Sequence, residues 1–453
     1  MEPVDNAWLV VFRIAFGLIM FIEVVIYFNR GLITKYYLDP SLFFPYYGFE
    51  WVKPWPGAGM YIHFAVMGVL ALMIASGLMY RLATALFFLA FTHVFLIDQT
   101  NFLNHLYLIC LLSFMMIIIP ADRSFSLSVW FRPNRRRDAA PRWTLWLLRF
   151  QFGVVYFYGG IEKLNMDWLS GQPMKAFLEG RGEVPIVGTA LQQPFGVHLL
   201  TWGGTIFDLL VVPMLLWKPT RSFTFTIAVA FHVVNSHLFQ IGIFPWLMIV
   251  ATTMYLSPDW PRRVFRKWKR REPATAKDNR RSRLVEAFLI VWVTVHLLMP
   301  LRHFLYPGFL LWTKEGIYFS WYMMYGYGES QILYLVVDPE SGEKHRVDPK
   351  TFVSNGKIGR NAEKADLTMR QVGVLGRRPE MILAFAHHLA EQWRKNGYKN
   401  VQVYAYSQAS LNGRKPQRLV DKSVNLAAEP RIPGHKNWIV SLEEPLPELD
   451  WRK

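Results

Sequence analysis

One lysine and one histidine–asparagine pair stand in stretches of sequence that are otherwise compatible with lipid. Lys163 lies in GGIEKLNMDWLSG (Gly159 to Gly171), and His232 and Asn235 lie in FHVVNSHLFQIGIFPW (Phe231 to Trp246). A charged side chain at the centre of a bilayer costs about 2.5 to 3.5 kcal/mol on insertion scales. We therefore expect these residues to reach the interface, to pair with neighbours or to line a functional cavity.

Lys163 follows an apolar and aromatic helical stretch and precedes Asp167 and Trp168. One interpretation is structural: the lysine amine reaches water beside an aromatic residue of the interface. The functional alternative is a neutral amine, because desolvation disfavours the charged form and a neutral amine accepts a proton from a weak acid. Gly159 and Gly160 would let another helix or a flat ring approach the backbone closely.

His232 and Asn235 are three residues apart and therefore share one helical face. A lone buried histidine usually only hydrogen-bonds a neighbour, but the pair Asn104–His105 at the start of another predicted helix favours a shared polar pocket. The donors for a competing metal site would be His105, His232, His237 and His303. No HExxH motif or paired-carboxylate spacing accompanies them, so we predict no metal.

Composition and apolar runs predict a multi-pass membrane protein. Of the 453 residues, 52% are hydrophobic and 16% aromatic, and a helix needs about 20 apolar residues to cross a bilayer. The predicted spans are Trp8 to Phe28, Gly59 to Met79, Ala83 to Ile97, His105 to Ile119, Trp143 to Gly160, Val197 to Trp217, Phe223 to Phe239, Ile241 to Leu256 and Leu284 to Met299.

The predicted fold is mostly α: a polytopic transmembrane helical bundle of about nine spans at residues 1–312, then a small extramembrane α+β domain at 313–453. In the second part, Ile332 to Asp348 predicts two strands around a turn, Glu380 to Asn396 an amphipathic helix and Val401 to Tyr406 a strand. The single cysteine, Cys110, excludes an intramolecular disulfide.

The formal net charge of +17 gathers in two connections, Asp122 to Arg142 and Pro258 to Arg283. The positive-inside rule predicts that both are cytoplasmic, where they would meet anionic lipid; we expect no nucleic acid partner. The N-terminus would then be cytoplasmic and the C-terminal domain extracytoplasmic. In this topology the polar residues converge near the outer leaflet, namely Asn104, His105, Lys163, His232, Asn235 and His303.

Several ordered blocks resemble the vitamin K-dependent γ-glutamyl carboxylase family of HTTM-domain membrane proteins. The match covers most of the membrane part, at DQTNFLNHLYL (Asp98 to Leu108), VYFYGGIEKLNMDWLSG (Val155 to Gly171), WGGTIFDL (Trp202 to Leu209), FHVVNSHLFQIGIF (Phe231 to Phe244), SPDWPRR (Ser257 to Arg263), MPLRHFL (Met299 to Leu305) and GIYFSWYMM (Gly316 to Met324). Any one block alone would be a weak signal.

In that family a membrane-embedded lysine deprotonates a naphthohydroquinone, which reacts with dioxygen. The strong base formed removes a γ-proton from a peptide glutamate, carbon dioxide adds to the carbanion, and the quinone epoxide is released. The resemblance implies Lys163 as the base, with His105 and Asn104 as catalytic helpers. It also implies cofactor-binding roles for five other residues of these blocks, namely His232, Asn235, His303, Trp168 and Trp202.

The resemblance implies reduced vitamin K or menaquinol as cofactor, with O2 and CO2 as co-substrates. Implied partners are a glutamate-containing peptide or protein, the lipid bilayer and a quinone reductase that supplies hydroquinone. Animal members carry a second lysine where this chain has Glu162, and their disulfide needs a second cysteine. We therefore expect a short, bacterial-type homologue of the inner membrane without animal-type client recognition.

Three alternatives remain open at this point. The chain could epoxidise quinol without carboxylating a peptide. It could be a non-enzymatic quinone- or lipid-binding membrane scaffold, in which Lys163 is protonated and reaches the interface. A transporter would be expected to contain an inverted repeat with matched broken helices, which we do not find.

Overall fold

The computed structural model describes residues 3–179, 188–239, 241–265, 267–268, 283–323, 326–353 and 366–449. Each of the nine predicted apolar runs contains a helix. These are α1 (Ala7–Asn29), α2 (Gly59–Ser76), α3 (Tyr80–Ile97), α4 (Asn104–Ile118), α6 (Arg142–Ile161), α10 (Pro194–Leu216), α11 (Arg221–Leu238), α12 (Phe244–Thr252) with the 3₁₀ turn η4 (Thr253–Tyr255), and α14 (Arg283–Leu298).

Five helices in the described part of the chain are long and apolar enough to cross a membrane. They are α1, α2, α3, α10 and α14 together with the 3₁₀ helix η5 (Met299–Leu305). The helices α4 and α12–η4 are apolar but shorter, and α6 and α11 carry arginines and more polar side chains. The prediction of a polytopic bundle agrees with this, whereas nine complete crossings are not confirmed.

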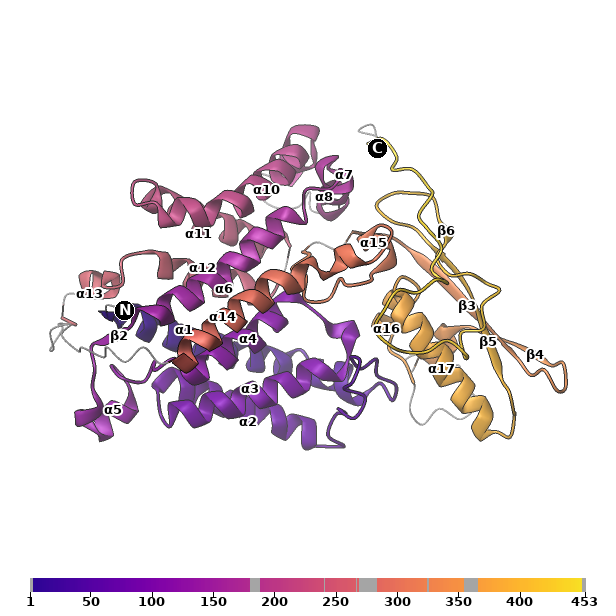
Figure 1. Cartoon of the computed structure of the whole chain (residues 1–453), viewed down its shortest axis with the longest axis horizontal. Coiled ribbons are helices and arrows are strands. Elements are labelled where there is room, and N and C mark those ends of the chain that lie inside the picture. Colours follow the sequence, from indigo (N-terminus) through magenta and orange to yellow (C-terminus); the bar gives the residue numbers. More distant parts are fainter. Residues whose placement is uncertain are drawn as a thin grey trace.

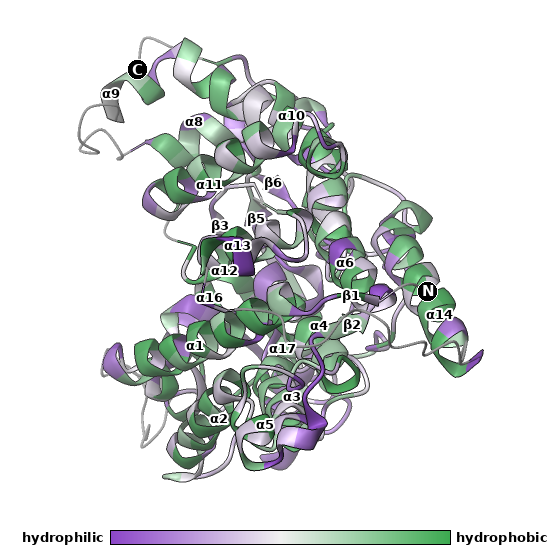
Figure 2. Cartoon of the chain, turned by 90° about the vertical axis from the view of Figure 1, so that its left-hand side faces the viewer, coloured by the Kyte–Doolittle hydropathy of each residue, from purple (hydrophilic) through white to green (hydrophobic). Residues whose placement is uncertain are grey.

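Close helix packing in the bundle depends on small residues. A Cβ added to Gly17 of α1 would lie 2.5 Å from the backbone oxygen of Ala71 on α2, so these two helices approach at a distance that only glycine permits. Around this contact the core is aromatic, and Phe12 and Phe152 meet edge to face at a centroid distance of 6.3 Å. Green, hydrophobic residues run along the bundle helices in Figure 2.

The chain's N-terminal end and both arginine-rich connections lie together. Strand β1 (Pro3–Asp5) pairs antiparallel with β2 (Ala139–Pro141), and Arg262 of α13 (Trp260–Val264) forms an ion pair with Asp5 at 2.9 Å. Figure 1 places these elements, with α5 (Leu127–Phe131), at the end of the bundle opposite the sheet. The predicted topology requires the N-terminus and both arginine-rich connections to lie at the same end of the bundle, and the described residues agree with this. In the second connection, Arg266 and residues 269–282 lie outside the described part.

The C-terminal part is a four-stranded antiparallel sheet in the order β4-β3-β5-β6, covered by a helix. Its elements are β3 (Ser330–Val337), β4 (Lys344–Val347), α16 (Met369–Leu375), α17 (Pro379–Lys395), β5 (Gln402–Ala409) and β6 (Gln417–Arg418). Alternate residues of β5 are buried, and the apolar face of α17, including Phe385 and Leu389, is fully buried. The predicted strands and amphipathic helix are therefore present.

The segment that joins the two parts, residues 314–323, is called the junction segment below and packs against both. After η5 and the short helix α15 (Leu310–Thr313), residues 314–323 return to the bundle, where Trp321 is 1% exposed. Trp312, by contrast, belongs to the core under the sheet. Lys314, Phe319 and Trp321 all have positive φ angles, a strained conformation that persists only where surrounding contacts enforce it. The boundary at 312/313 stays a prediction, since this segment interlocks the two cores.

Candidate functional site

Lys163 lies just after α6, and its amine meets a carboxylate from α10. Lys163 Nζ is 2.5 Å from Asp208 Oδ2, and the two side chains are 10% and 5% exposed. A charge at membrane depth is tolerated when it is paired and hydrogen-bonded. The structural interpretation of the sequence expected the amine to reach water at the interface. The structure instead holds the amine inside the protein, beside the Asp208 carboxylate.

Two glycines permit this meeting. A Cβ on Gly160 would lie 2.8 Å from the Leu209 side chain and 3.1 Å from the Leu209 backbone nitrogen, so α6 and α10 touch at this level. A Cβ on Gly159 would collide with Met323 Cε and come within 3.6 Å of Asp208 Oδ2. The expected close approach at Gly159 and Gly160 is thus made by α10 and by the junction segment.

Trp168 forms an aromatic wall beside the amine. It lies on the short helix α7 (Met166–Leu169), with its ring centroid 5.4 Å from Lys163 Nζ, within the range of a cation–π contact. The indole nitrogen donates to Thr205 Oγ1 at 3.0 Å, which fixes the ring against α10. Trp168 therefore lies beside Lys163, and its cofactor-binding role stays a prediction.

Asn104 is connected to the lysine turn through Tyr322 of the junction segment. Asn104 Nδ2 donates to the Tyr322 backbone oxygen at 2.7 Å, and Asn165 Nδ2 donates to the Tyr322 hydroxyl at 3.0 Å. Asn165 also donates to the Glu162 backbone oxygen and accepts from the Trp168 backbone N–H, so it shapes the turn that carries Lys163. These bonds join α4, the junction segment and the lysine turn.

Asn104 and His105 retain polar atoms without a described protein partner. Asn104 Oδ1 is buried and has no hydrogen-bond partner among the described residues. The His105 ring stacks on Phe244 at 5.7 Å, and no hydrogen bond joins it to a described group. A buried carbonyl oxygen without a donor is costly unless a ligand or water supplies one, so this pair is suited to a hydroxyl-bearing ligand.

His232 is bound to α6 and not directly to the lysine. Its Nε2 lies 2.7 Å from the Tyr156 hydroxyl, and both rings pack against Phe207, the residue before Asp208. His232 therefore supports the helices that carry the ion pair.

His303 approaches the neighbour of the lysine. Its Nε2 is 3.5 Å from Glu162 Oε1, while its Nδ1 bonds the Pro300 backbone oxygen at 2.8 Å. Both side chains are mostly buried, and Glu162 Oε1 has no hydrogen-bond partner among the described residues. Glu162, the residue before Lys163, thus faces a second predicted site residue.

Two predicted residues lie further from the pair. Asn235 is half-buried on α11, and Trp202 is 46% exposed on α10, so their cofactor-binding roles stay predictions. His237 hydrogen-bonds the Val233 backbone oxygen of its own helix. Within the described ranges, no three histidine, cysteine or acidic side chains come together as potential metal ligands.

Sequence reasoning missed Asp208, although a signal was present. Asp208 is the only acidic residue of α10, and a lone carboxylate in an apolar span needs a partner just as a lone lysine does. Tyr156 and Tyr322 were also missed, because tyrosines in aromatic-rich helices and loops carry no spacing signal that separates them from packing residues.

One cavity of the described structure has a lining that does not include Lys163. It measures about 660 Å³ and lies between the bundle and the sheet domain. The Lys163–Asp208 pair remains the candidate site despite this, because a buried ion pair and buried polar atoms without a described partner occur there. Tyr318 and Phe319 of the junction segment line the cavity, and the next residues of the same segment reach Asn104 and Gly159.

Comparisons with known proteins match both parts of the chain. Residues 1–260 match the family model of the HTTM domain, and residues 281–445 match the model described as the vitamin K-dependent gamma-carboxylase, lumenal domain. No solved structure matched the chain. The first match covers more than half of the 453 residues.

Proposed function

The chain belongs to the vitamin K-dependent γ-carboxylase family of HTTM-domain proteins, and from this we propose that it is a γ-glutamyl carboxylase and quinol epoxidase. It would use a reduced naphthoquinone, vitamin K or menaquinol, with dioxygen and carbon dioxide. A quinone reductase would regenerate the hydroquinone. The observation that carries the proposal is the buried Lys163–Asp208 pair at the contact of α6 and α10.

Lys163 is the proposed base. Base action starts from the neutral amine, and the Asp208 carboxylate then stabilises the ammonium that forms when Nζ accepts a proton. The contact between Lys163 Nζ and Asp208 Oδ2 supports this role, because it places a carboxylate where the ammonium would form. Asp208 and the Trp168 ring also fix the direction of the amine, which supports proton transfer because the donor must come within hydrogen-bond reach.

The cofactor's binding groups are proposed to be Asn104 and His105. The unpartnered Asn104 Oδ1 fits a hydroxyl donor, and the His105 ring beside Phe244 fits a flat aromatic ligand. A bound hydroquinone would supply the acidic hydroxyl and, with dioxygen, the strong base for the glutamate γ-proton. The buried surroundings exclude water, which would otherwise quench a carbanion. His232, Asn235, His303 and Trp202 are proposed to complete the pocket.

The proposed location is a bacterial inner membrane, with a cytoplasmic N-terminus and an extracytoplasmic sheet domain. The shared position of the arginine-rich connections at one end and of the sheet at the other supports this orientation (Figure 1). A glutamate-containing peptide would then approach Lys163 from the side of the sheet domain.

Product analysis tests the proposal. Purified protein would receive reduced vitamin K or menaquinol, labelled bicarbonate and a short glutamate peptide, beside Lys163→Ala and the exposed control Lys422→Ala. We expect epoxide and labelled peptide from the wild type and from Lys422→Ala, and neither from Lys163→Ala.

The other outcomes separate the alternatives. Epoxide without labelled peptide would identify a quinol epoxidase that does not carboxylate the peptide supplied. Absence of both products with every quinol, from protein that still binds quinone, would contradict the enzyme and favour the binding scaffold.

A further inference from the structure

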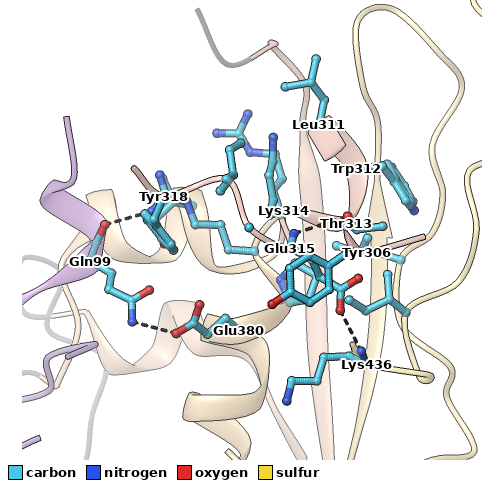
Figure 3. Close-up of a pocket in the computed structure, with 18 of the residues that line it drawn as sticks. Gln99, Tyr306, Leu311, Trp312, Thr313, Lys314, Glu315, Tyr318, Glu380 and Lys436 are labelled. Carbon is cyan, nitrogen blue, oxygen red and sulfur yellow. Dashed lines mark hydrogen bonds between the residues drawn. The ribbon is translucent and has the colours of Figure 1, made fainter. Parts of the chain in front are cut away.

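The cavity between the bundle and the sheet domain is walled by charged and aromatic side chains from both. Tyr46, Gln99 and Arg302 come from the bundle side, and Arg377 and Lys436 from the sheet domain. Figure 3 shows side chains from several elements around one hollow. Its volume of about 660 Å³ falls in the range of about 300 to 1,000 Å³ that is usual for ligand sites.

Cations outnumber carboxylates in this cavity. The cationic residues are Arg302, Lys314, Arg377, Arg378 and Lys436, and the acidic ones are Glu315 and Glu380. The cationic residues outnumber the acidic ones by three in a space that is partly screened from water, even though Lys314 is only partly protonated near pH 7. A cavity of one dominant sign attracts ligands of the other sign.

The two acids already have other hydrogen-bond partners. Glu315 accepts from the Lys436 backbone N–H at 2.7 Å and lies 3.0 Å from His435 Nδ1, while Glu380 accepts from Gln99 Nε2 at 2.8 Å (Figure 3 shows the bonds of Gln99 and Lys436). Neither is paired with Arg302 or Arg377, which instead donate to the backbone oxygens of Tyr318 and Gly328. In the described part of the chain, no carboxylate lies within ion-pair distance of these two guanidinium groups.

We propose that this cavity binds the carboxylate side chains of an acidic peptide, at a docking site separate from the Lys163 pair. The inference rests on the proposed function, since it names where a glutamate-rich client would be held while one of its side chains is carboxylated. Guanidinium groups fit this ligand because they bind carboxylates with two parallel hydrogen bonds. The aromatic walls, including Tyr47 and Trp312, would contact the apolar parts of the peptide.

Lys314 gives the site a distinctive pH dependence. Burial, and then the nearby charges of Arg378 and Arg377, lower the pKa of Lys314 to about 7. In the described part of the chain, the other titratable or charged groups of this cavity are Arg302, Lys436, Glu315 and Glu380, the tyrosines Tyr46, Tyr47, Tyr306, Tyr318 and Tyr327, and His435 beside Glu315. A bound carboxylate favours the ammonium form, so binding takes up a proton near neutral pH and weakens as pH rises through about 7.

The position of the cavity favours a peptide over an anionic lipid headgroup. Four of the five cations belong to the sheet domain or to the segment after α15, beyond the helices that could cross a membrane. Only Arg302 comes from the candidate span that ends at Leu305. A headgroup would instead be expected to meet cations at the ends of the spans.

Binding measurements on the full chain in phosphatidylcholine nanodiscs test the site without quinol or oxygen. The probe is a fluorescent tetra-glutamate peptide with blocked ends, and tetra-glutamine is the control ligand. We expect Arg377→Gln to weaken tetra-glutamate binding about tenfold or more, with Arg346→Gln, an exposed arginine on β4, as the matched control. Lys163→Ala should bind normally while it fails to turn over, which separates this inference from the proposed function.

Proton uptake gives a second readout that needs no destabilising variant. Calorimetry in buffers of different ionisation enthalpy should show uptake by the wild type near pH 7, and Lys314→Met should abolish it. Equal binding of tetra-glutamate by Arg377→Gln and Arg346→Gln, or binding without proton uptake, would overturn the proposal. The proposal would also be overturned if the protein did not bind tetra-glutamate in phosphatidylcholine nanodiscs and phosphatidylglycerol bound in the cavity instead.

Discussion

Asp167 of α7 and Arg414 after β5 form a two-pronged ion pair across the two parts of the chain. Arg414 donates to both carboxylate oxygens, at 2.6 and 2.7 Å, and Asn412 donates to the same group at 2.7 Å. The residue after Asp167 is Trp168, whose ring faces the Lys163 amine. The sheet domain is thus anchored one residue away from a wall of the candidate site.

We expect Arg414→Gln to loosen this anchor. It leaves the Asp167 carboxylate, which is 4% exposed, without its counter-charge, and breaking a buried pair costs about 3 to 5 kcal/mol. Hydrogen exchange should rise in residues 166–169 and 411–414. The double variant Arg414→Gln with Asp167→Asn should recover part of the lost stability, because no carboxylate is then left without a counter-charge. The exposed control Arg418→Gln should change neither the stability nor the hydrogen exchange. Equal hydrogen exchange in all three variants would contradict the role of the ion pair as an anchor.

Asp208→Asn should remove most of the activity while the protein still folds. The amide is similar in size but cannot stabilise the ammonium of Lys163, and general-base catalysis contributes about 10² to 10⁴ in rate. Quinol-dependent epoxide formation is the measurement, with Asp259→Asn at the opposite end of the bundle as control. Activity within twofold of wild type would show that the pair is only structural.

Gly160→Ala tests whether the approach of α6 to α10 sets the site. The new methyl group would meet Leu209, including its backbone, and forcing a methyl into a packed contact costs about 1 to 3 kcal/mol. We expect a lower melting temperature and lower activity. Gly204→Ala, on α10 itself, is the matched control because nothing lies within 4 Å of its added Cβ. If Gly160→Ala and Gly204→Ala have the same melting temperature and activity, the close approach of α6 to α10 at Gly160 does not set the geometry of the site.

Acid should weaken the docking of the sheet domain through Asp366. The His388 ring and the Ser41 hydroxyl hold the pKa of Asp366 below its usual value, and Ser41 donates to this carboxylate from the bundle side. A lowered pKa gives stability that is present above the unfolded value of about 3.9 and is lost as pH falls through the folded value. Melting curves at decreasing pH should therefore show a smaller loss for Asp366→Asn than for wild type; parallel losses would contradict this role.

Helix positions could be predicted because they depend on local sequence. The runs that became α1, α2 and α3 are apolar over enough residues to form helices wherever they pack, and the alternation of β5 and the apolar face of α17 are equally local signals. The number of crossings could not be fixed in this way, because α6 and α11 combine apolar and polar faces. Lys163 was also visible, since a lone base in an apolar stretch is unusual.

The sequence by itself determined a helical membrane bundle with a small sheet domain and its family, and it singled out Lys163 as the candidate base. Only the tertiary structure decided what that lysine meets. Its partner Asp208 lies 45 residues away, and Arg414 lies 247 residues from Asp167. Such pairs arise from how helices and loops pack at Gly160 and along the junction segment. No periodicity within a single element records that packing.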